Sequence, residues 1–97
     1  MESLTINFCY SLADQKIKIA NIEKLELLLC LCEAKLGNDI DLPFKRVIII
    51  GTDYIINEYS NLIKSLNRIV RQSRKIGVSF TVWEKEPQDA SDFKLNF

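Results

Sequence analysis

Acidic and aromatic side chains follow two apolar segments of this sequence, and they are the residues best suited to chemistry or recognition. One group follows Arg46–Ile50 and the other follows Val78–Trp83. Together the groups comprise Asp53, Tyr54, Asn57, Glu58, Tyr59, Glu84 and Glu86. Carboxylates act as general acids or bases when burial shifts their pKa, yet the acid pairs here lie in hydrophilic stretches. Recognition of a basic surface is therefore the better use of these groups.

The remaining reactive residue types point away from catalysis. The chain has three cysteines and no histidine, so it lacks the commonest general base and the usual zinc partner. Cys30 and Cys32 would lie about 200° apart on a helix, which is wrong for a metal pair. Cys9 and these two suit a reducing compartment as small apolar fillers. We expect a protein that is not an enzyme and binds no metal or cofactor.

The turn Gly51-Thr52-Asp53 follows an apolar strand and precedes a helix, as many phosphate-binding loops do. Such loops need several glycines, and a Walker loop also needs a lysine followed by serine or threonine. This turn has only one glycine, Gly51, and the bulky residues Tyr54, Ile55 and Ile56 follow the turn. The turn is therefore interpreted as a corner, with Asp53 or Asn57 capping the next helix.

Composition predicts a single domain, residues 1–97, with a polar C-terminal tail from about residue 87. The 97 residues are 47% hydrophobic, which is enough for one core, and 13 basic residues balance 13 acidic ones. The first twelve residues lack the basic leader of a signal peptide, and no apolar run approaches the roughly 20 residues of a membrane span. We expect a cytoplasmic protein that has no membrane association.

The first half of the chain is predicted to form a hairpin and a helix. Apolar residues alternate over residues 4–12 and again over residues 16–20, which predicts two strands joined by a turn. A helix is expected over residues 22–36, with Asn21 as its N-cap and Gly37-Asn38 as a left-handed stop.

The second half is predicted to form a strand, a helix and a strand. In the run Arg46–Ile50, four consecutive β-branched residues follow the arginine, as in a strand buried on both faces. An amphipathic helix is expected over residues 58–75, then a stop at Gly77 and a strand over residues 78–83. The fold class is α/β: a small two-layer β-β-α-β-α-β sandwich, with a four-stranded mixed sheet and both helices on one face.

This topology would separate the charges. Right-handed crossovers make the later strands parallel, so the segments that follow them emerge at one edge. The acidic and aromatic group named above gathers there with Asp89 and Trp83, and Glu23 and Glu26 join if residues 16–20 also run parallel. The opposite end receives Lys35, Lys45, Arg46, Arg74 and Lys75, partly offset by Asp39 and Asp41. An acidic edge with aromatic anchors suits one cognate protein that has a basic surface.

Two further surfaces remain open to interpretation. A second apolar stripe on the first helix, Leu27, Cys30, Leu31 and Ala34, predicts either cover by the C-terminal tail or a homodimer interface, so the protein is a monomer or a homodimer. A basic stripe on the second helix, Lys64, Arg68, Arg71 and Lys75, could bind an RNA backbone. The absence of interleaved aromatic residues disfavours nucleic acid as a partner.

Two families share parts of this pattern. The stretch Val47–Trp83, with "NEYSNL" at the start of a helix, resembles the STAS domain of anti-sigma-factor antagonists. This resemblance implies a STAS-like regulatory module with Ser60 in the phosphorylatable region, although Tyr59 and Asn61 replace the paired serine and the glycine. The ending "IVRQSRKIGVSFTVW" is similar to that of barstar-like inhibitors, which block a ribonuclease with acidic and aromatic residues.

These expectations lead to three functional hypotheses. The first is a small inhibitor of the toxin-immunity kind, an antitoxin that neutralises one partner, for example a nuclease toxin, through its acidic aromatic edge. The alternatives are the STAS-like regulatory module and RNA binding through the second helix.

Overall fold

The computed structural model describes residues 3–10, 13–38, 40–86 and 95–96. Three parallel strands, β1 (Ser3–Asn7), β2 (Arg46–Ile50) and β3 (Ser79–Trp83), lie in this order across the sheet, and β4 (Leu95–Asn96) adds a two-residue antiparallel pairing to β3. The fold is α/β, as expected. Most of the predicted tail, residues 87–94 and 97, lies outside the described residues.

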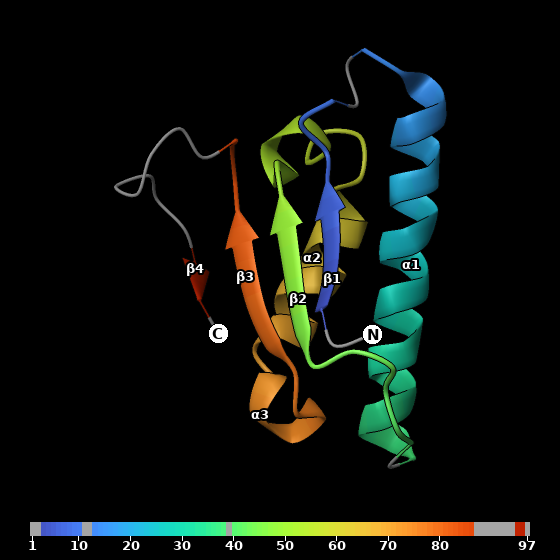
Figure 1. Cartoon of the computed structure of the whole chain (residues 1–97), viewed down its shortest axis with the longest axis vertical. Coiled ribbons are helices and arrows are strands. Elements are labelled where there is room, and N and C mark those ends of the chain that lie inside the picture. Colours follow the sequence, from blue (N-terminus) through green and yellow to red (C-terminus); the bar gives the residue numbers. More distant parts are fainter. Residues whose placement is uncertain (1–2, 11–12, 39, 87–94, 97) are drawn as a thin grey trace.

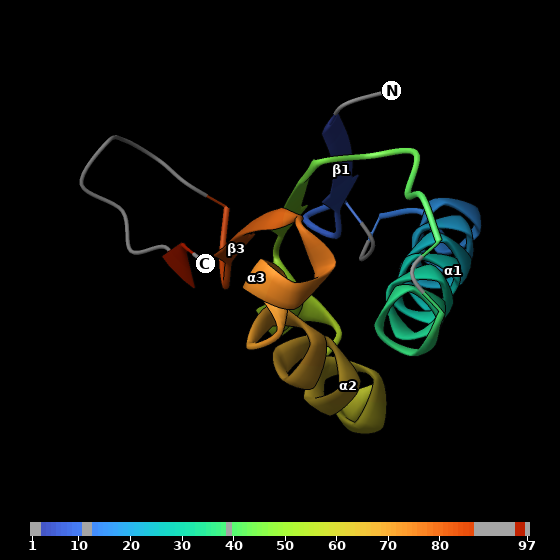
Figure 2. The ribbon, with the colours of Figure 1, turned by 90° about the horizontal axis from the view of Figure 1, so that it is seen from below.

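Helices make both connections between the parallel strands. α1 (Gln15–Gly37) joins β1 to β2, and a 3-10 turn, η1 (Thr52–Tyr54), with α2 (Ser60–Val70) and α3 (Ser73–Ile76) joins β2 to β3. The strands point the same way, so their carboxyl ends share one edge (Figure 1). All three α-helices lie on one side of the sheet (Figure 2). No helix in the described residues is long and apolar enough to cross a membrane.

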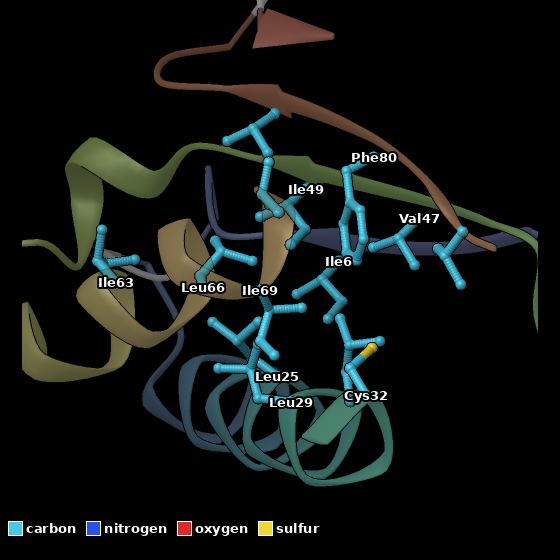
Figure 3. Close-up of a cluster of buried hydrophobic side chains, with 14 of the residues drawn as sticks. Ile6, Leu25, Leu29, Cys32, Val47, Ile49, Ile63, Leu66, Ile69 and Phe80 are labelled. Carbon is cyan, nitrogen blue, oxygen red and sulfur yellow. The ribbon is translucent and has the colours of Figure 1, made fainter. Parts of the chain in front are cut away.

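The core lies between the sheet and the helices. Alternate strand residues face the helices, because successive side chains of a strand point to opposite faces. Ile6, Val47, Ile49 and Phe80 are fully buried, and they meet residues such as Leu25 of α1 and Leu66 and Ile69 of α2 (Figure 3). Burial of these side chains at ~1.5–3 kcal/mol each is the main term that holds the helices against the sheet.

The predicted second strand and its hairpin are wrong, because residues 16–20 form the first turns of α1. The Asp14 carboxylate accepts hydrogen bonds from the backbone N–H groups of Lys16 (2.9 Å) and Ile17 (3.4 Å), which makes Asp14 the N-cap. Five alternating residues are too few to separate a strand from a helix, and the cap decides between them. The four-stranded mixed sheet as predicted, with residues 16–20 as one of its strands, is wrong in the same way, because the antiparallel pairing in this sheet comes from β4.

The predicted start of the first helix and the conformation of its stop need correction. Asn21 is inside the helix, and its side-chain amide donates to the Asn7 carbonyl at 2.8 Å. The helix does end at Gly37, but a left-handed stop is wrong, since only Gly51 and Gly77 have positive φ among the described glycines. Instead the N–H of Asn38 donates to the Ala34 carbonyl at 2.8 Å.

The single helix predicted over residues 58–75 is two helices. α2 ends at Val70 and the short α3 follows from Ser73, with Gly77 as its left-handed C-cap (φ 74°), as predicted. Neither Asp53 nor Asn57 caps α2: its N-cap position is Tyr59, which makes no side-chain capping bond. The predicted helix stop is therefore confirmed and the predicted cap is wrong.

The sheet face away from the helices has no layer over it among the described helices (Figure 2). Ile48, Ile50 and Trp83 lie on this face and are half-buried, while Thr5 and Ser79 are exposed. β2 is thus fully buried on the helix side only, and the prediction of burial on both faces is wrong. A parallel sheet usually has both faces covered.

Candidate functional site

The C-terminal edge of the sheet holds the predicted acidic and aromatic residues, and backbone hydrogen bonds join its two segments. The N–H of Gly51 donates to the Trp83 carbonyl at 2.8 Å, and the N–H of Asp53 donates to the Glu84 carbonyl at 3.0 Å. The segments after β2 and β3 therefore run side by side. The sequence prediction that Asp53 lies near Glu84 is confirmed.

Gly51 allows this close approach. Its φ of 85° lies in the left-handed region, which residues with a Cβ rarely adopt. A Cβ placed on Gly51 would lie 3.0 Å from Tyr54 Cδ2 and 3.1 Å from Cys9 Sγ. The glycine therefore does more than end β2, because it lets the η1 turn pack against the segment that follows β1.

Exposure divides the predicted residues into two kinds. Asp53, Asn57, Glu58, Glu84 and Glu86 are exposed. Tyr54 and Tyr59 are half-buried and pack against the core. The carboxylates can therefore reach a partner, whereas the two tyrosines mainly support the edge.

Lys18 is a member of this edge that sequence reasoning missed. Its side chain is only 7% exposed, and its Nζ lies 2.5 Å from Glu58 Oε1 and 5.9 Å from the centre of the Tyr59 ring. The alternating pattern of residues 16–20 predicts that Lys18 lies in an edge strand. Its pairing with Glu58, 40 residues away, therefore could not be predicted from the sequence. Glu58 is therefore occupied by an internal ion pair, and it is the least available of the acids.

Two further side chains at this edge are exposed and largely apolar, and neither is among the predicted partner-binding residues. Tyr10 follows β1 and is 59% exposed, and Ile56 lies in the predicted segment and is 40% exposed. The alternating pattern placed Tyr10 within a strand, which concealed its position in the turn after β1. Exposed aromatic and aliphatic groups beside acids are typical of protein-binding surfaces.

Cys9 lies under the same edge. Burial raises the pKa of the Cys9 thiol, and the nearby Glu86 carboxylate raises it further. A thiol with a raised pKa is a poor nucleophile at neutral pH.

Comparison with protein-family models, curated proteins and solved structures gave no significant match to this chain. The described residues contain no group of three or more Cys, Asp and Glu side chains that could hold a metal ion.

Glu23 and Glu26 do not join the acidic edge. They were expected there only if residues 16–20 formed a parallel strand, and those residues belong to α1 instead. The start of α1 instead brings Lys16 and Lys18 toward this edge, so its acidity is lower than the sequence suggested. Asp89 lies outside the described residues.

The opposite end of the molecule carries the predicted basic residues. Lys35 is near the end of α1, Lys45 and Arg46 are at the start of β2, and Arg74 and Lys75 are in α3, all at the lower end in Figure 1. Asp41 is nearby in sequence, and Asp39 lies outside the described residues. The predicted separation of charge between the two ends of the sheet is retained.

The second apolar stripe borders a groove beside β1. Leu27 is 61% exposed, Leu31 and Ala34 are half-buried, and Cys30 is exposed. The groove has a volume of about 280 Å³ and is lined by Leu4, Lys24, Leu27, Leu28, Leu31, Pro43 and Phe44. That the C-terminal tail or a second copy of the chain covers this surface stays a prediction.

The basic stripe of the second helix is interrupted. Arg68 pairs with Glu33 of α1, Arg71 is at the end of α2, and Lys75 belongs to α3. The four basic side chains therefore do not follow one helical face, which weakens the structural basis for the RNA-binding alternative.

Proposed function

We propose that the protein is a non-enzymatic inhibitor that holds the basic surface of one partner protein at the C-terminal edge of its sheet. The observation that carries this proposal is the hydrogen bond from the Asp53 N–H to the Glu84 carbonyl, at 3.0 Å. This bond fixes two acid-bearing segments next to each other on a folded scaffold. Binding then costs little further ordering of the backbone.

A nuclease is a suitable class of partner for such an edge. Nucleases carry basic surfaces for the phosphate backbone, and exposed carboxylates can occupy those surfaces in place of nucleic acid. Asp53, Glu84 and Glu86 would supply the charge, and Tyr10 and Ile56 would supply apolar contact. This is the mode of action expected of a toxin-immunity protein.

The decisive variant removes the charge and keeps the shape: Asp53→Asn, Glu84→Gln and Glu86→Gln together. A pull-down followed by mass spectrometry identifies the partner, and calorimetry then measures the Kd. We expect binding to weaken by more than tenfold, about 1.4 kcal/mol, mainly through a slower association rate. Glu58 is left unchanged because its removal would strand the buried Lys18.

The matched control removes three acids elsewhere: Glu26→Gln, Glu33→Gln and Asp41→Asn. These residues are exposed, and Glu26 and Glu33 lie five and twelve residues beyond Asn21, the residue of α1 that contacts the end of β1. Affinity should stay within about twofold, roughly 0.4 kcal/mol. Equal affinity of both triple variants for the partner would contradict the proposed interface.

A second candidate function is the STAS-like regulatory module, and the position of Ser60 favours it. Ser60 is exposed and is the first residue of α2. A phosphate there would be stabilised by the positive end of the helix dipole. Incubation with a cognate kinase should add one phosphate to Ser60 and none to the Ser60→Ala variant, as measured by mass spectrometry. Absence of phosphate from the wild-type chain would count against this alternative.

A further inference from the structure

A row of polar side chains crosses the three parallel strands at their N-terminal ends. Ser3, Arg46 and Ser79 are register partners on β1, β2 and β3. Their neighbours Val47 and Phe80 are buried on the helix side, so the row lies on the helix-free face. Adjacent strands are about 4.8 Å apart, which places each serine next to the arginine.

The row forms a hollow in the surface. Its volume is about 270 Å³, and it is lined by Ser3, Lys45, Arg46 and Ser79. All four residues are exposed, so a ligand can enter from solvent. The volume is just below the roughly 300 Å³ at which pockets for drug-sized ligands begin, so the hollow suits a small group.

The lining residues share one chemical property, because all their side chains can donate hydrogen bonds. Arginine presents a planar fork of N–H groups, lysine an ammonium group, and serine a hydroxyl group. Among the described residues, the lining includes no carboxylate. Two cations and two hydroxyl groups around one hollow are suited to an anion with several oxygen atoms.

Basic residues also predominate in the rest of this end, although the exposed Asp41 offsets part of their charge. Arg74 and Lys75 of α3 lie at the same end of the sheet. Asp53, Glu84 and Glu86 follow the opposite ends of the strands, about 13 Å away along five residues. This separation exceeds the Debye length of about 8 Å at physiological ionic strength, so those acids are largely screened from the hollow.

We propose that this hollow binds a phosphate group, either as inorganic phosphate or as the terminal group of a phosphate monoester. The Arg46 guanidinium pairs with two phosphate oxygens, and Lys45 adds a second positive charge. The hydroxyl groups of Ser3 and Ser79 donate to oxygens on either side. The remainder of a monoester would extend over Thr5, Ile48 and Thr81, the next row of the same face.

The test is a titration of the intact protein with inorganic phosphate, followed by two-dimensional ¹H–¹⁵N NMR at constant ionic strength with chloride as the reference. We expect saturable shifts of the amides of Ser3, Lys45, Arg46 and Ser79. Arg46→Gln should weaken binding at least tenfold. The NMR spectrum of Arg46→Gln shows whether this variant is folded. If it is not, Lys45→Gln is the second variant, and it should also weaken phosphate binding.

The control is Arg71→Gln, which removes an exposed arginine from the end of α2 on the helix side of the sheet. It should bind phosphate as the wild type does. Equal weakening by Arg71→Gln, or equal shifts in chloride alone, would overturn the proposal in favour of non-specific attraction. Titration with phosphoserine separates the two sources: tighter binding than inorganic phosphate indicates a monoester, and equal or weaker binding indicates the free anion.

Discussion

At the scale of single residues, burial assigns different roles to side chains of the same type. Lys18 is 7% exposed and pairs with Glu58, whereas Lys16, two residues earlier, is exposed. Cys32 is fully buried, whereas Cys30 is exposed. Burial raises the pKa of the Cys32 thiol to about 11, with a further contribution from Glu33.

We predict that iodoacetamide at pH 8 modifies Cys30 rapidly and leaves Cys32 intact in the folded protein. With a pKa of about 11, Cys32 would be thiolate in only about one molecule in a thousand at pH 8, and its side chain is out of reach of the reagent. Peptide mass spectrometry measures each site. In urea all three cysteines should react, and equal rates at Cys30 and Cys32 without urea would contradict the described core.

The raised pKa of Cys32 also predicts a loss of stability in alkali. The unfolded chain releases the thiol proton near the ordinary value of 9, whereas the folded protein retains it up to about pH 11. The free energy of unfolding should therefore fall between pH 9 and pH 11. Urea denaturation of the wild type and of Cys32→Ala, compared for their slopes against pH, measures this contribution.

At the scale of elements, α1 both covers the core and protects the free edge of β1. The Lys24 ammonium donates to the Thr5 carbonyl at 3.2 Å, and the Asn21 amide donates to the Asn7 carbonyl at 2.8 Å. Side chains of the helix thus occupy backbone acceptors that another strand would need. This arrangement discourages edge-to-edge association of the sheet.

Adjacent leucines of α1 should differ sharply in their contribution to stability. Leu28 is 1% exposed in the core, and Leu27 is 61% exposed beside the groove. We expect Leu28→Ala to lower the free energy of unfolding by about 2–5 kcal/mol and Leu27→Ala by about 0.5 kcal/mol. Chemical denaturation provides both values, and a large loss from Leu27→Ala would show that its surface is covered.

At the scale of the whole molecule, one sheet separates two ends of opposite character. In the two proposals, the C-terminal edge presents Asp53, Glu84 and Glu86 to a basic partner, and the N-terminal end presents Arg46 and Lys45 to an anion. Because the two ends are independent surfaces, a partner protein and a phosphate group could be bound at the same time.

The groove beside Leu27 is the remaining surface on which self-association is predicted. Seven of the described residues line it, whereas a stable dimer interface takes about 20–30 residues from each partner. We therefore expect sedimentation velocity to give the monomer mass from micromolar to millimolar concentration. A mass that rises with concentration in the wild type and stays constant in Leu27→Glu would instead establish the homodimer.

The sequence by itself determined the elements whose hydrophobic pattern was long or continuous. It placed β2 at Arg46–Ile50 and the helix stop at Gly77, and it identified β3 as parallel to β2, because right-handed crossovers leave little choice. It therefore also placed Asp53 near Glu84. Local pattern is sufficient where one face of an element must meet the core.

Only the tertiary structure decided the first half of the chain and the detail of both surfaces. Residues 16–20 alternate like a strand, but the Asp14 cap and the pairing of Lys18 with Glu58, 40 residues away, make them helical. The row Ser3, Arg46 and Ser79 comes from three distant segments and exists only through strand register. Contacts between distant residues carry no local signal, and for this reason the sequence could not predict them.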